Sequence, residues 1–289
     1  MSRLDQHAII VGGTEGTRTF EPPDYVVYNT LIHRSVHLLI GPPKHGKSYV
    51  ATTLAWACSG PEHSSFFNKP VDIYGPIIYV AAEGAIAQEM RFEALRQKHG
   101  NRDHPIYLLK CKVNLSNPGE ARELADYVKL RDGVMIVIDT ANACGAGKED
   151  TEAMNAFAHG LGLLQNYTKA TTVVLHHSPQ ADATRPRGST VLPALVDSWW
   201  TTAKDKDGLF KLSAGEGRAS ATLASDSLGE FRLETYRLLD ENDMPMSNVK
   251  GRPVEVGVVV EAGEFKAKQQ PSKCNEAAAK AQSKLYARS

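Results

Sequence analysis

The sequence predicts an α/β domain with a doubly wound, mostly parallel sheet, helices on both faces and an antiparallel C-terminal extension. Short apolar runs alternate with longer segments of helical spacing, which indicates right-handed strand–helix–strand crossovers. The runs are almost wholly apolar, as parallel strands covered on both faces are. They are SVHLLI (35–40), PIIYVAA (76–82), VMIVI (134–138) and TTVVL (171–175). After about residue 205, closely spaced strand-like runs predict the antiparallel part. These are LFKLSA, SATLAS, FRLETYRLL and PVEVGVVVEAG.

Three segments between the runs carry helical patterns. KSYVATTLAWACSG (47–60) ends in a glycine that suits a helix C-terminus. EARELADYVKL (120–130) has apolar residues at helical spacing. TEAMNAFAHGLGLLQNY (151–167) starts at Thr151, a favourable N-cap residue. Its apolar stripe predicts core packing and consists of Met154, Phe157, Ala158, Leu161 and Leu164.

The chain of 289 residues is long enough for one large α/β domain. We expect an N-terminal segment (1–24), the domain itself (25–262) and a mobile polar tail (263–289) rich in Lys, Ala and Gln. Lys plus Arg and Asp plus Glu number 33 each, so the chain as a whole has no basic field. Contacts to nucleic acid would therefore come from a few local loops.

The four cysteines have no CxxC spacing, which argues against a disulfide framework or a zinc ribbon. They are Cys58, Cys111, Cys144 and Cys274. No signal peptide pattern is evident, and no apolar run has the roughly 18 residues that a membrane span needs. We expect a cytoplasmic protein.

The segment GPPKHGKS (41–48) matches the phosphate-binding P-loop pattern GxxxxGK[ST], between an apolar strand and a helical segment. Its glycines allow backbone amides to turn toward a phosphate, and the helix N-terminus adds partial positive charge. Lys47 is expected to reach the β- and γ-phosphates of ATP, and Ser48 to bind Mg²⁺. The residues predicted to bind the nucleotide are Gly41, Pro42, Pro43, Lys44, His45, Gly46, Lys47, Ser48 and Tyr49.

Two carboxylates follow predicted strands. Asp139 ends VMIVID, where it can bind Mg²⁺ beside the P-loop. Glu83 follows IIYVAA, where a carboxylate can orient and deprotonate the water that attacks a phosphoanhydride. The alternatives are that Asp139 caps a loop and that Glu83 only begins the next helix, where negative charge is favourable.

The strand TTVVLHH brings His176 and His177 to the same edge of the sheet. Adjacent residues on a strand point to opposite faces, so the two imidazoles do not form a zinc pair. We expect one imidazole to contact the γ-phosphate and the other to pack or cap the strand. The simpler alternative is a core histidine without a functional role.

These motifs resemble those of RecA-like ATPases. The closest resemblance is to the small hexameric replicative helicases of broad-host-range plasmids (the RepA type) and to related phage proteins. It spans roughly residues 25–240 and rests on the following segments, which occur in the family's order with comparable spacing. They are YVVYNTLIHRSVHLLIGPPKHGKS, YVAAEG, VIDT, VLHHS and RGSTVLPALVDSWW. The resemblance implies a RecA-like fold, a bacterial or phage-infected host cell, and a ring, most often hexameric, with ATP between subunits.

Carried over to this sequence, the resemblance makes Glu83 the catalytic base, with Lys47 and Ser48 as nucleotide and Mg²⁺ ligands. Asp139 becomes the second Mg²⁺ ligand. The γ-phosphate sensor would be His177 in preference to His176. An arginine of a neighbouring subunit would complete the catalytic site.

Both Arg218 and Arg187 are candidates for that arginine. The loops ANACGAGKED and PQADATRPRGST would face single-stranded or branched DNA, with Lys148, Arg185 and Arg187 as phosphate contacts. Ordinary surface loops are the alternative.

Three functions are compatible with these residues. The first is an ATP-driven helicase or translocase in DNA replication. The second is a non-motor RecA-like ATPase in recombination or branched-DNA processing, possibly associated with a nuclease. The missing Lys-x-Arg pair after Trp200, which the family leads one to expect, slightly favours this second function. The third, a small-molecule kinase, leaves Glu83 and the histidines without roles.

Overall fold

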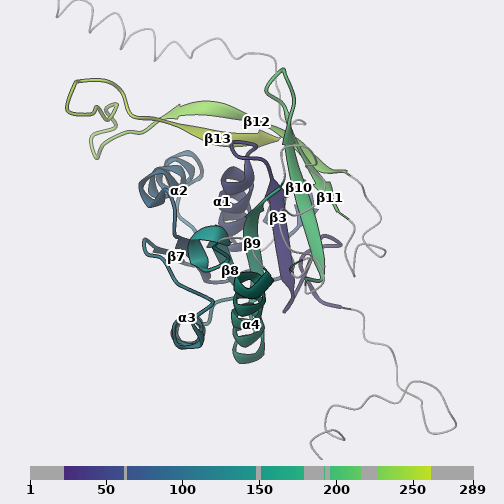
Figure 1. Ribbon diagram of the computed structural model, residues 1–289. Helices are drawn as coiled ribbons and strands as arrows, with labels where there is room; N and C mark the ends of the chain where they lie inside the picture. The colour runs from purple at the N-terminus through teal and green to yellow at the C-terminus, as the bar shows by residue number, and fades with distance from the viewer. Residues whose placement is uncertain are drawn as a thin grey trace, which may run out of the picture.

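The computed structural model describes residues 23–61, 64–147, 151–178, 192, 196–215 and 227–261 (Figure 1). A single nine-stranded sheet organises them, in the order β13-β12-β11-β10-β3-β9-β8-β6-β7. The six strands from β10 to β7 pair in parallel, and β11, β12 and β13 extend the sheet antiparallel. The predicted α/β class, with its parallel sheet and antiparallel extension, is confirmed.

The parallel strands are β3 (Val36–Gly41), β6 (Ile77–Ala81), β7 (Ile106–Leu109), β8 (Met135–Asp139), β9 (Thr171–His177) and β10 (Ser198–Lys204). The antiparallel strands are β11 (Phe210–Ala214), β12 (Ser227–Arg237) and β13 (Glu255–Glu261). The helices are α1 (Lys47–Cys58), α2 (Ala85–His99), α3 (Pro118–Leu130), α4 (Thr151–Tyr167) and the short 3-10 helix η1 (Asn142–Cys144). Two small hairpins complete the list: β1 (Tyr25–Val27) with β2 (Leu31–Ile32), and β4 (Ser65–Phe66) with β5 (Lys69–Pro70).

Each face of the parallel sheet has its own core, because successive strand residues point to opposite sides. In β8, Val137 packs with α1 and the aromatic residues of the antiparallel strands, whereas Ile136 and Ile138 pack with α3 and α4. Figure 1 shows the two helix pairs apart, with α1 and α2 under the β12–β13 hairpin and α3 beside α4. Burial on both faces explains why these strands are continuous apolar runs in the sequence.

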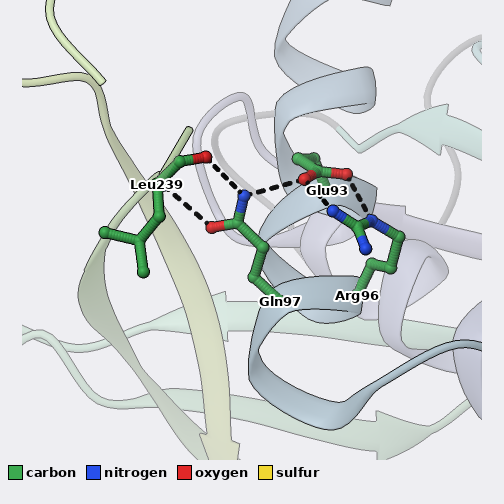
Figure 2. A network of polar contacts seen from close by, with 4 residues as sticks. All are labelled: Glu93, Arg96, Gln97 and Leu239. Carbon is green, nitrogen blue, oxygen red and sulfur yellow. Dashed lines mark hydrogen bonds and ion pairs between the residues drawn. The ribbon is translucent and has the colours of Figure 1, made fainter. Parts of the chain in front are cut away.

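A third core cluster joins the β12–β13 hairpin to α1 and α2; its buried members are Trp56, Ala94, Leu95, Leu238, Val256 and Val258. At the C-terminal end of α2, the Gln97 amide makes two hydrogen bonds to the backbone of Leu239 (Figure 2). Gln97 Nε2 donates to the Leu239 carbonyl and Gln97 Oε1 accepts from the Leu239 amide, both at 2.9 Å. The amide nitrogen also donates to Glu93, which pairs with Arg96. Helix α2 is thus fixed to the hairpin by polar and apolar contacts.

The predicted strand SATLAS and the predicted mobile tail lie outside the described residues. Within the described ranges, no helix is both long and apolar enough to cross a bilayer.

Helix α4 offers a test of the packing against the loop that precedes α3. A Cβ added to Gly160 would overlap the carbonyl oxygen of Leu115, whereas a Cβ added to Gly162, on the same helix, would meet no atom. We expect Gly160→Ala to lower the free energy of unfolding by about 1–3 kcal/mol, because backbone must move. Gly162→Ala should raise it by about 0.5–1 kcal/mol through helix propensity. Urea denaturation of the two variants measures the difference, and equal effects would contradict this packing.

Candidate active site

The P-loop bends sharply into α1 at Gly46, the N-cap residue, with φ of 89°. A Cβ at this position would lie 2.8 Å from Phe210 and 3.0 Å from Phe231. These two rings stack with their centroids 4.9 Å apart, and they come from the antiparallel strands β11 and β12. Only glycine therefore suits this position, on account of both its conformation and its surroundings. The antiparallel extension therefore packs against the P-loop at Gly46, through the rings of Phe210 and Phe231.

Lys47, the first residue of α1, is a buried cation with only 6% of its surface exposed. Its ammonium group donates to the carbonyls of Gly41 (2.8 Å) and Pro42 (3.0 Å) and lies 3.3 Å from Nδ1 of His177. Burial lowers the pKa of Lys47 to about 8, although the negative charge of Asp139 acts in the opposite direction. The group is thus poised for an anion that would stabilise its charged form.

Asp139 ends β8 and is 4% exposed. Burial raises the pKa of its carboxyl group, against hydrogen bonds from Tyr79 and Ser48 and the positive charges of Arg91 and Lys47. The Tyr79 hydroxyl donates to Asp139 Oδ2 at 2.9 Å. The carboxylate at the end of β8 therefore faces the Ser48 hydroxyl in the first turn of α1. Oxygen ligands of this kind suit Mg²⁺.

Glu83 and Gly84 connect β6 to α2, and Gly84 is the N-cap of α2 with φ of 63°. Farther along α2, Arg91 reaches the same region. Its guanidinium lies 4.2 Å from the centroid of the Tyr49 ring and donates to Gln88 at 2.7 Å. Gln88, itself buried, donates to Thr52 of α1. Helix α2 thus forms one wall of the site and places a second cation there.

The two histidines at the end of β9 diverge as strand alternation predicts. His176 is fully buried, whereas His177 is partly exposed and contacts the Lys47 ammonium. Of the pair, His177 is the one that faces the P-loop.

These groups meet in one cleft of about 480 Å³ at the carboxyl edge of the parallel strands. The cleft is lined by Pro43, Lys44, Gly46, Lys47, Ser48, Tyr49, Glu83, Gly84, Ala87, Arg91, Asp139, Thr140 and His177.

The sequence family described as AAA domain matches residues 10–183, which include every one of these cleft residues. The chain belongs to this family. Its members are P-loop ATPases related to RecA-like helicases. No curated protein matches the chain.

The AAA domain of this chain fits a magnesium nucleotide by its own geometry. The positive φ of Gly46 lets the loop turn its backbone amides toward a phosphate at the start of α1, and Lys47 supplies buried positive charge. Ser48 and Asp139 would hold the Mg²⁺ ion, which when bound neutralises phosphate charge and fixes the geometry of the phosphates.

Some predicted residues lie apart from the cleft. Neither Gly41 nor Pro42 lines it, and both instead turn their carbonyls to Lys47. The His45 ring faces β10, where its Nδ1 accepts from the Lys204 amide at 3.1 Å. The predicted DNA and inter-subunit contacts lie outside the described residues; they are Lys148, Arg185, Arg187 and Arg218.

Four cleft residues were not predicted from the sequence, Gly84, Ala87, Arg91 and Thr140, and the last two have polar side chains. Arg91 belongs to a helix whose apolar residues contact both the sheet and the hairpin, so no single stripe marks its polar face. Thr140 follows Asp139 directly, and a threonine after a strand gives no signal of its own.

The lowered pKa of Lys47 predicts proton uptake when nucleotide binds. At pH 8.5 the ligand-free amine is mostly neutral, and an anionic diphosphate beside it raises its pKa and draws a proton from solution. At pH 7 the amine is already charged, so this uptake should disappear. Calorimetric titration of the protein with ADP, in two buffers of different ionisation enthalpy, measures the protons taken up. The same number at both pH values would show that Lys47 is not the group that titrates.

Proposed function

We propose that this P-loop ATPase is an ATP-driven helicase or translocase that acts on single-stranded or branched DNA in replication. The observation that carries the proposal is the convergence of Lys47, Glu83, Asp139 and His177 on one cleft, since each of them ends a parallel strand or belongs to the segment that follows one. A cation, a metal-binding carboxylate, a second carboxylate and an imidazole together suit hydrolysis of a nucleotide. A kinase would leave Glu83 and His177 without roles.

The chemistry assigned to these residues is hydrolysis of the terminal phosphoanhydride. Glu83 accepts a proton from the attacking water as its oxygen bonds to the γ-phosphorus. The bond from that phosphorus to the β–γ bridging oxygen breaks, and ADP and phosphate leave. Lys47 stabilises negative charge on the β- and γ-phosphates, and His177 responds to the loss of the γ-phosphate.

The DNA and assembly parts of the proposal come from the resemblance to RecA-like helicases. The ring places ATP between subunits, with Arg218 or Arg187 of one subunit completing the cleft of the next. Lys148, Arg185 and Arg187 provide local positive charge in a chain that is neutral overall, so DNA binding should weaken steeply with added salt.

The decisive experiment measures ATP hydrolysis with and without single-stranded DNA, together with displacement of a strand from a forked duplex. We expect DNA to stimulate hydrolysis several-fold. Lys47→Ala should reduce hydrolysis at least about 100-fold and abolish strand displacement, because it removes the cation beside the phosphates. Lys98→Ala is the matched control, since Lys98 is an exposed lysine in the last turn of α2 and does not line the cleft.

The possible outcomes distinguish the helicase or translocase from the non-motor ATPase and from the kinase. Hydrolysis that DNA stimulates without strand displacement would indicate the non-motor ATPase of recombination or branched-DNA processing. Hydrolysis that DNA does not change would contradict both DNA functions. Transfer of phosphate to a small acceptor, without release of free phosphate, would indicate a kinase.

A further inference from the structure

The Thr140 hydroxyl is a buried polar group without a hydrogen-bond partner among the described residues. Thr140 is 6% exposed, and its Oγ1 is closed off from solvent. A buried hydroxyl left unpaired is costly, and each one in a native structure calls for an explanation. Since Thr140 lines the nucleotide cleft, a bound ligand is the natural source of the missing partner.

An unpaired hydroxyl alone does not define a site, as Thr172 shows. Thr172 is 1% exposed and its Oγ1 likewise has no partner within the described residues. It lies near the start of β9, however, paired with Val36 at the opposite end of the sheet from the P-loop. The two threonines therefore differ in one relevant respect, the cleft that Thr140 lines.

The position of Thr140 within the cleft is fixed by the sheet. The strand that it directly follows, β8, lies between β9, which ends at His177, and β6, which leads to Glu83. The residues on either side of Thr140 are tied to those neighbours. The Ala82 amide donates to the Asp139 carbonyl at 3.0 Å, and the Ala141 amide donates to the Leu175 carbonyl at 2.9 Å.

Thr140 thus follows a strand whose two neighbours lead to the carboxylate proposed as general base and to the imidazole proposed to detect the γ-phosphate. A hydroxyl can accept one hydrogen bond and donate another at the same time. One side chain here can accept from a water molecule while it donates to a phosphoryl oxygen. The side chains of Arg91 and Lys47, by contrast, can only donate to the nucleotide.

We propose that the Thr140 hydroxyl binds the γ-phosphoryl end of the nucleotide and holds the attacking water for Glu83. This inference rests on the proposed ATP hydrolysis and adds a residue to it. The contact is made with the reacting atoms, so Thr140 should matter more in the transition state than in the product complex.

The test compares the affinities of Mg–ADP and of Mg–ADP with aluminium fluoride, which mimics the phosphoryl group in transfer. Thr140→Val keeps the shape of the side chain and removes the hydroxyl. We expect it to weaken binding of the aluminium fluoride complex at least about tenfold, with Mg–ADP affinity within about twofold of the original protein. Thr140→Ser keeps a hydroxyl and should bind both complexes nearly as the original protein does.

Thr172→Val is the matched control and should leave both affinities unchanged. Melting temperatures without ligand confirm that each variant is folded; if Thr140→Val is not, Thr140→Ala supplies the second variant without a hydroxyl. Equal affinities for the aluminium fluoride complex in Thr140→Val and Thr172→Val would overturn the proposal. So would an equal loss of affinity for Mg–ADP and for the aluminium fluoride complex in Thr140→Val. Failure of the original protein to hydrolyse ATP would instead remove the proposed function, and this inference with it.

Discussion

Parallel pairing of β3, β9, β8 and β6 is the constraint on which the cleft depends. Strands that run in one direction end at one edge, so a loop, an imidazole and two carboxylates from distant parts of the chain become neighbours. Insertion of β9 between β3 and β8 brings His177 against Lys47 and leaves Asp139 facing Ser48 at the start of α1. Reversing any one of these strands would remove its polar end from the cleft.

The same arrangement buries charge that the protein alone does not fully compensate. For Lys47, a pKa lowered to about 8 corresponds to a penalty of roughly 3 kcal/mol against the charged form. The Asp139 carboxyl is also driven toward its neutral form by burial. A triphosphate beside the lysine and a divalent cation beside the carboxylate would each restore the ionised state. Ligand-free protein is therefore less stable at this edge than a complex with nucleotide and metal.

Most of the parallel sheet and its edge could be predicted from the sequence. Buried parallel strands appear there as apolar runs, and the polar residues of the edge come directly after these runs. Gly41, Asp139 and His177 each end a strand in the structure. The support behind Gly46 could not be predicted, since Phe210 and Phe231 come from hairpin strands far along the chain. Nor could Arg91 or Thr140, whose roles depend on contacts across elements and not on local spacing.

Helix α2 has one end in the cleft wall and the other on the β12–β13 hairpin. Glu83 and Gly84 precede its first turn. In its last turn, both polar atoms of the Gln97 amide form hydrogen bonds with the Leu239 backbone. Because these hydrogen bonds and the third core cluster join α2 to the hairpin, a tilt of the helix at the cleft would also move the β12–β13 hairpin.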